Sequence, residues 1–367
     1  MTDTLHALMR EATRLTRAGQ LTQATQALQR ALGGMASTRF SPEPSDAALI
    51  LDGTVYPHAA RDSQDADFDL GTFTGASYTH CGLTRRYKLY VPPAAAQRPL
   101  ALVVMLHGCT QNPDDFAAGT NMNAMAREQG FLVLYPEQSQ DANPSRCWNW
   151  FKHTHQRRGS GEPALLAGLT HGVVQEHGLD PRRVYIAGLS AGGAMAAIAA
   201  SAYPEVFAAV GVHSGLPGGV AQNLPEALML MKNGAATHNG LAAKPAAQRF
   251  VPTIVFHGDQ DKTVHPLNGE QVVAAVLAGH ANADAVGPSL SAPDAVEHGV
   301  VPRGRRYTRS IYNDGTGAPM AEHWLVHGAG HAWSGGMASG SYTDATGPDA
   351  TREMLRFFFS LSQRQEH

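Results

Sequence analysis

The pattern with the clearest chemistry lies at residues 186–193, which read Ile-Ala-Gly-Leu-Ser-Ala-Gly-Gly. Ser190 is the centre of a Gly-x-Ser-x-Gly motif, between a β-type run and a run of small residues typical of a helix. A sharp strand-to-helix turn exposes such a serine, and Gly188 and Gly192 are needed because a Cβ there would collide with neighbouring backbone. The following helix directs free N–H groups at negative charge on a substrate. The motif predicts a nucleophilic serine and therefore a serine hydrolase.

A serine nucleophile needs an imidazole to accept its proton and a carboxylate to orient that imidazole. In folds with this turn the chain order is serine, acid, histidine. The buried run 251–257 ends in Gly258 and two acids, Asp259 and Asp261. Asp259 adjoins the glycine and is the better candidate for fixing the turn. We assign Asp261 as the triad acid and keep Asp259 as the alternative.

The chain has 18 histidines, and the order rule leaves those after Asp261. His331 lies in Gly328-Ala-Gly-His-Ala-Trp, a loop of small residues after the last predicted strand, which would let its imidazole reach Ser190. His323 and His327 begin and end that strand and are better explained as strand residues. We therefore assign His331 as the base.

A tetrahedral intermediate needs two backbone donors for its oxyanion. One is expected to be the N–H of Ala191, the residue after the nucleophile. The other is expected from the turn Leu106-His-Gly-Cys-Thr-Gln, which makes the Cys109 N–H the second donor and Gly108 the residue that permits the close turn. A tight turn around a buried thiol would have the same geometry.

The elements that must position these residues alternate between strand and helix. Short apolar strands separated by helices indicate a mostly parallel sheet covered on both faces, an α/β fold whose ligands bind at the carboxyl ends of the strands. The expected strands are 71–78, 85–91, 100–106, 131–135, 183–187, 207–212, 253–257, 306–312 and 323–327, and the expected helices are 121–129, 163–177, 191–202 and 348–361.

Outside these elements, we expect an N-terminal helical hairpin at 1–34, a linker or irregular wrap at 35–70, and a catalytic domain at 71–367. The hairpin resembles one tetratricopeptide unit and is interpreted as a docking or dimerisation appendage, hence a possible homo-oligomer contact. Residues 218–248 and 269–304 are interpreted as long insertions. The first carries apolar residues at helical spacing. This spacing fits either a helical cap over the site or a helix packed on the sheet.

Composition excludes several function classes. A net charge of −3 and a pI of about 6.6 give no basis for binding nucleic acid or an anionic membrane. The sequence has no apolar run long enough for a transmembrane helix and no visible leader, so we expect a cytoplasmic protein, with secretion left open. Three cysteines without metal-ligand spacing predict neither a disulfide scaffold nor a metal site, and serine chemistry needs no cofactor.

Six segments together resemble the polyhydroxybutyrate depolymerase-like esterase family of the α/β-hydrolase fold, which borders on the feruloyl and acetylxylan esterases. The resemblance covers about residues 85–358, and the segments His107-Gly-Cys and Cys147-Trp-Asn-Trp-Phe are its most specific parts. The others are 159–163, 188–195, 257–261 and 330–333. The resemblance implies hydrolysis of carboxylic esters through an acyl-enzyme and the same triad of Ser190, Asp261 and His331.

The resemblance also implies roles for residues beside the triad. Trp148, Asn149 and Trp150 are expected to line the substrate cleft, with a core-filling role as the alternative. Cysteines that match Cys109 and Cys147 can form a disulfide in similar proteins, although a cytoplasmic location argues against a stable one. Cys81 is expected to be a free, buried thiol.

The chain departs from secreted depolymerases of solid polyester, which carry a leader, a linker and a polymer-binding domain. It ends soon after its last predicted helix, so we expect soluble or oligomeric esters as substrates. Two alternatives to an esterase remain. One is a peptidase or thioesterase that uses the same triad, and the other is a catalytically silent scaffold that acts in binding.

Overall fold

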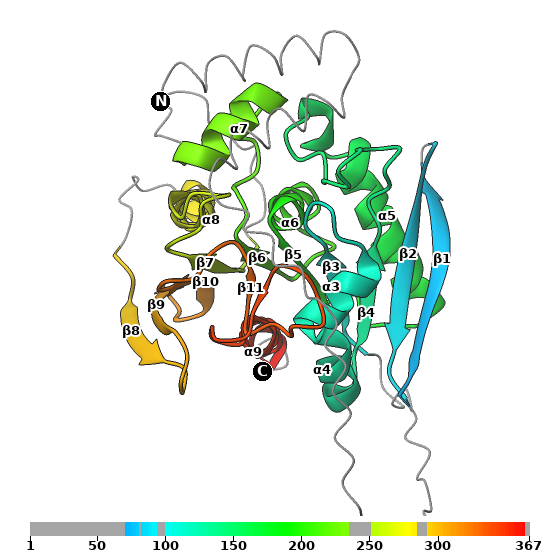
Figure 1. The fold of residues 1–367 in the computed structure, drawn as a ribbon. Coiled ribbons are helices and arrows are strands. Elements are labelled where there is room, and N and C mark those ends of the chain that lie inside the picture. The colour runs from blue at the N-terminus through cyan, green and yellow to red at the C-terminus, as the bar shows by residue number, and fades with distance from the viewer. Residues whose placement is uncertain (1–69, 81, 94–99, 235–250, 285–291, 364–367) are drawn as a thin grey trace, which may run out of the picture. The chain divides into compact units, whose positions relative to one another are not determined.

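The computed structural model describes residues 70–363 except 81, 94–99, 235–250 and 285–291 (Figure 1). The predicted hairpin at 1–34, all but the last residue of the wrap at 35–70, and Cys81 therefore lie outside the described residues.

The described residues build a ten-stranded sheet in the order β1-β2-β4-β3-β5-β6-β7-β10-β9-β8. The six central strands, from β4 to β10, are parallel, and the two strands at each edge are antiparallel to their neighbours. The strands are β1 (Thr72–His80), β2 (Leu83–Val91), β3 (Leu102–Leu106), β4 (Leu132–Pro136), β5 (Val184–Leu189), β6 (Ala209–His213), β7 (Thr253–Gly258), β8 (Ala295–Val300), β9 (Arg306–Asn313) and β10 (Pro319–Val326).

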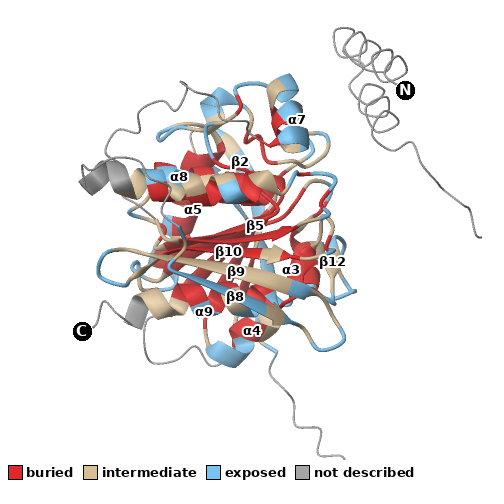
Figure 2. Ribbon diagram, turned by 90° about the vertical axis from the view of Figure 1, so that its left-hand side faces the viewer, coloured by how far each residue is buried: buried red, intermediate tan, exposed pale blue. Residues whose placement is uncertain are grey.

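Helices cover both faces of this sheet, because side chains alternate along each central strand. In β3, Leu102, Val104 and Leu106 join one apolar core, while Val103 and Met105 join the other. The first core is closed by α5 (Gly161–Glu176), α6 (Ala191–Ala202) and α8 (Leu267–Asp284), and the second by α3 (Pro113–Thr120), α4 (Met122–Gln129) and α9 (Ala350–Gln363). Figure 2 shows the buried strands between these two helical layers.

This architecture confirms the predicted α/β-hydrolase fold. The expected insertion at 269–304 is wrong in part, because it contains most of α8, which packs on β7 and β10, and the edge strand β8. Its apolar residues repeat at helical spacing because they face the first core. Helix α3, which begins at Pro113 with the Asn112 side chain as its cap, is not among the predicted helices.

The insertion at 218–248 forms α7 (Leu224–Asn233), and its residues from 235 lie outside the described part. α7 packs on the start of α8, where the Asn268 amide donates to the Leu230 carbonyl over 3.1 Å. Among the described helices, none combines the length and apolarity that a membrane crossing requires.

Candidate active site

Ser190 occupies a strained turn between β5 and α6. Its φ of 57° and ψ of −119° lie outside the regions that most residues adopt. A Cβ on Gly192 would lie 2.1 Å from the Leu106 carbonyl oxygen, and one on Gly188 would lie 2.4 Å from the Gly192 carbonyl carbon. Both glycines are therefore required by close backbone packing, as the sequence predicts, and the strain is typical of a functional turn.

Asp261 and His331 form a hydrogen-bonded pair in which the acid is buried and the imidazole is partly buried. The His331 Nδ1–H donates to Asp261 Oδ2 over 2.6 Å, and the backbone N–H groups of Thr263 and Val264 donate to Oδ1 over 2.8 and 2.9 Å. Burial opposes ionisation of Asp261, but the hydrogen bonds from histidines and backbone outweigh it and hold the pKa of its carboxyl well below the ordinary range. The charged acid therefore orients His331 with Nε2 free to accept a proton.

Ser190 and the His331 loop meet through His213, at the end of β6. The Ser190 N–H donates to the His213 carbonyl over 2.8 Å, and the Ser334 N–H donates to His213 Nε2 over 2.9 Å. Burial lowers the pKa of His213 to about 3, so its ring is neutral and can accept this bond. The carboxyl ends of β5, β6, β7 and β10 thus bring the three predicted triad residues to one edge of the sheet.

The Ser190 hydroxyl has no hydrogen-bond partner within the part of the chain that the structure describes, and the residue is 8% exposed. Catalytic hydrogen bonds commonly tighten only when substrate binds.

The alternative acid and base form a separate pair with each other. Asp259 accepts from His327 Nδ1 over 2.9 Å and from the Gly328 N–H over 2.7 Å, and His327 Nε2 lies 2.9 Å from the Thr308 hydroxyl. Both His327 nitrogens are therefore occupied, and the pair joins the ends of β7 and β10. This arrangement favours Asp261 and His331 as the triad residues.

The turn after β3 presents one backbone donor that the protein does not use. The Gly108 N–H donates to Gln111 Oε1 over 2.9 Å, and the Thr110 N–H donates to the Ser145 carbonyl over 2.7 Å. Among the described residues, the N–H groups of Cys109 and Ala191 have no acceptor. Gly192 packs on the carbonyls of Leu106 and His107, so the two free donors belong to adjoining turns. This geometry suits the predicted oxyanion site.

The three residues predicted to line the cleft are buried instead. Trp148 is fully buried and its indole N–H donates to the His107 carbonyl over 3.1 Å, while Trp150 is 4% exposed. The Asn149 N–H and side-chain amide both donate to the buried Glu162 carboxylate over 2.8 Å. Their burial favours the alternative named above, a core-filling role, and the indole bond of Trp148 braces the oxyanion turn from inside.

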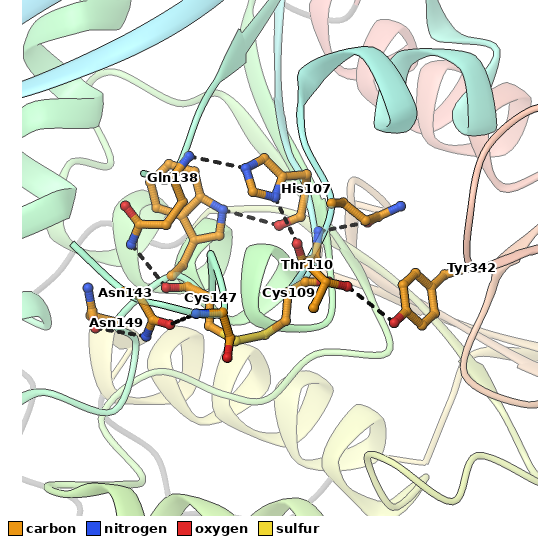
Figure 3. Close-up of a disulfide and its surroundings, with 12 residues drawn as sticks. His107, Cys109, Thr110, Gln138, Asn143, Cys147, Asn149 and Tyr342 are labelled. Carbon is orange, nitrogen blue, oxygen red and sulfur yellow. Dashed lines mark hydrogen bonds between the residues drawn. A yellow bond between two sulfur atoms is a disulfide. The ribbon is translucent and has the colours of Figure 1, made fainter. Parts of the chain in front are cut away.

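A disulfide joins Cys109 to Cys147 and links the oxyanion turn to the loop that carries these residues (Figure 3). Figure 3 also shows Tyr342, whose hydroxyl lies 3.3 Å from that of Thr110 on the outer side of the turn. Of the two possibilities left open by the sequence, the structure contains the disulfide.

Reduction of this disulfide is expected to lower the free energy of unfolding by about 2–4 kcal/mol, because the bond closes a long loop in the unfolded chain. Urea unfolding with and without dithiothreitol measures the effect. A Cys109→Ser/Cys147→Ser variant, which has no such bond to reduce, is the control. Equal midpoints for the oxidised and reduced wild type would contradict the expectation.

Two histidines that were not among the predicted site residues, His213 and His257, support the site. His213 connects the nucleophile turn to the histidine loop, as described above. The His257 Nε2–H donates to the Val264 carbonyl over 2.9 Å and lies 3.5 Å from Asp261 Oδ2, so it braces the acid. A possible signal was their position, since each lies at or near the end of an apolar strand. In the described part of the chain, no group of three His, Cys, Asp or Glu residues is arranged to hold a metal ion.

The sequence is similar to those of known proteins. The profile of the family described as "Esterase PHB depolymerase" matches residues 85–298, more than half of the chain. Poly(3-hydroxyalkanoate) depolymerase C of Paucimonas lemoignei is 29% identical over 246 residues, 65% of this chain and 56% of that protein. Feruloyl esterase B of Neurospora crassa is 33% identical over 132 residues, 36% of this chain and 44% of that protein.

The chain therefore spans about half the length of these two relatives. Among solved structures, the acetyl xylan esterase of Aspergillus awamori superposes with a TM-score of 0.56 at 20% identity, over 78% of this chain and 99% of that one. At this identity the likeness concerns the fold.

Proposed function

Because the chain belongs to the Esterase PHB depolymerase family, we propose that it is a serine carboxylesterase that acts on short-chain, hydroxyalkanoate or oligomeric esters, including aromatic acyl esters. The observation that carries the proposal is the hydrogen-bonded Asp261–His331 pair, with its buried carboxylate, at the same sheet edge as the strained Ser190 turn. The names of the relatives, a polyester depolymerase and a feruloyl esterase, support ester hydrolysis as the reaction class.

In the proposed mechanism, Ser190 attacks the ester carbonyl while His331 Nε2 accepts its proton and then returns it to the leaving alcohol. Asp261 keeps the imidazole in the required tautomer and stabilises its charged form. The N–H groups of Cys109 and Ala191 bind the oxyanion. Water, activated by His331, then hydrolyses the acyl-enzyme and frees Ser190. No step requires a metal or an organic cofactor.

A panel of substrates tests the reaction class. We expect p-nitrophenyl acetate, butyrate and octanoate to be hydrolysed with kcat/KM at least about 100-fold above that of a peptide p-nitroanilide. The first three are esters, the proposed substrate class, whereas the anilide is an amide. A thioester of butyrate distinguishes the thioesterase alternative. Faster cleavage of the anilide or the thioester would overturn the proposal, and hydrolysis of none of them would favour the silent scaffold.

Location and assembly belong to the same proposal. The disulfide supports function in an oxidising compartment, because the cytoplasm keeps most thiols reduced, and it weighs against the cytoplasmic location expected from the sequence. Thiol labelling of the protein as isolated from its native compartment tests this point, and free Cys109 and Cys147 would contradict it.

Homo-oligomer formation through residues 1–34 is tested by light scattering of the full chain and of a chain without these residues.

A further inference from the structure

A charged pocket of about 500 Å³ lies next to the oxyanion turn and contains no triad residue. Its walls come from β1, from β2, from the start of α3 and from the residue after β4. Arg146 completes the lining. Because β4 runs parallel to β3 and β5, its carboxyl end and the pocket lie at the same sheet edge as Ser190.

The pocket is physically tied to the oxyanion turn in two ways. Arg146 adjoins Cys147, which is bonded to Cys109, and the Thr110 N–H donates to the carbonyl of Ser145, the residue before Arg146. Burial, with a smaller contribution from the positive charge of Arg146, lowers the pKa of His107 to about 4, which places that charge near the turn. A ligand in the pocket would therefore lie beside the oxyanion site.

Arg146 is the cation in this pocket whose charge is not neutralised by the described residues. Arg86 pairs with Glu137 over 3.3 Å, and Lys88 pairs with Asp114, so these four charges cancel. No carboxylate of the described residues pairs with the half-buried Arg146. The backbone φ of Arg146 is 52°, which is unfavourable for a side chain of this size. The turn maintains this conformation, because the Arg146 N–H donates to the Asn143 carbonyl over 2.8 Å. An anion is the complementary ligand.

We propose that this pocket is a carboxylate subsite, in which Arg146 binds the free acid end of a linear oligoester whose ester bond lies at Ser190. The inference rests on the proposed esterase function and specifies its substrate class. Hydrolysis of an oligoester leaves a carboxylate at one end of each product, and the planar guanidinium can bind it with two hydrogen bonds.

Distances along the sheet match such a ligand. Strands lie about 4.8 Å apart, so the ends of β5 and β4 are separated by roughly 10 Å across β3, and β2 is about 5 Å further. A four-bond hydroxy-acid unit spans about 5 Å, by comparison with at most about 3.6 Å for a three-bond amino-acid residue. Two or three units would connect Arg146 to Ser190, so the substrate is a short oligomer.

The test compares the linear trimer of 3-hydroxybutyrate as the free acid with its neutral methyl ester. In the wild type we expect the KM for the acid to be roughly tenfold lower than that for the methyl ester, the effect of one charge-assisted contact. Arg146→Gln is expected to bring this ratio close to one, and Arg146→Lys to retain part of it. Arg352→Gln, on the distant helix α9, is the matched control and should keep the wild-type ratio.

The ratio compares two substrates on one protein, so it does not depend on how much of a variant is active. If Arg146→Gln does not fold, ionic strength replaces it: high salt should raise the KM for the acid and leave that for the methyl ester nearly constant in the wild type. Equal KM values for acid and methyl ester in the wild type would overturn the subsite while leaving the esterase intact. If no ester is hydrolysed, the proposed function fails, and calorimetric binding of the two trimers still decides the subsite.

Discussion

Replacing Ser190 by alanine is expected to lower kcat for p-nitrophenyl butyrate by a factor on the order of 10⁵–10⁶, because the attacking oxygen is removed. The fold should persist, since the turn depends on Gly188, Gly192 and the backbone bond to His213 rather than on the hydroxyl. Steady-state kinetics measure the loss, and mass spectrometry after fluorophosphonate treatment shows whether one label is bound at Ser190.

Ser201 provides the control, because it is exposed and lies on the same helix, α6. Ser201→Ala should retain labelling and activity within about threefold of the wild type, as most surface substitutions do. Labelling that survives in Ser190→Ala would identify another nucleophile and contradict the proposed mechanism.

Asp261→Asn is expected to lower kcat about 10⁴-fold. An asparagine amide cannot accept the His331 Nδ1–H with the same strength and favours the wrong tautomer, in which Nε2 carries the proton. KM should change little, because Asp261 lies behind the imidazole and does not reach the substrate. Steady-state kinetics with p-nitrophenyl butyrate separate the two constants.

Asp259→Asn is the matched control, since it removes a carboxylate from the same loop that also pairs with a histidine. Its effect on kcat should stay below about threefold, because that pair is partly exposed and joins strand ends. A larger loss for Asp259→Asn than for Asp261→Asn would reverse the assignment of the acid.

The lowered pKa of Asp261 gives the sign of its pH dependence. The folded protein favours the charged form of the Asp261 carboxyl. The contribution of this carboxylate to the free energy of unfolding is therefore complete above its unfolded pKa of about 3.9. The contribution is lost as the pH falls through the lower pKa of the folded protein. The difference in the free energy of unfolding between wild type and Asp261→Asn, measured by urea unfolding at a series of pH values, should therefore be constant above about pH 5 and shrink in stronger acid.

The nucleophile turn was predictable because its constraints are local. A strand, two glycines around Ser190 and a helix of small residues follow one another directly, so the close backbone contacts that exclude a Cβ are encoded in eight residues. The choice of Asp261 and His331 rested on chain order and position after strands, and the structure adds the bond that joins them. The parallel sheet itself followed from alternating apolar strands and helices.

The role of residues 147–150 was not predictable, because an aromatic run looks the same in a cleft and in a core. In the structure, the buried Glu162 accepts two bonds from Asn149 and Trp148 donates to the His107 carbonyl, and these bonds hold this loop against the core. The pairing of Cys109 with Cys147 is likewise a contact across the sheet edge, 38 residues apart in sequence.

The sequence alone therefore determined the fold class, the nucleophile turn and the candidates for the acid and the base, since each depends on short-range pattern and on the order of elements. The tertiary structure decided which acid meets which histidine, which backbone donors stay free, and that Arg146 lies beside the oxyanion turn without a neutralising partner among the described residues. These features arise from contacts between strands that are distant in the chain, whose geometry no local pattern contains.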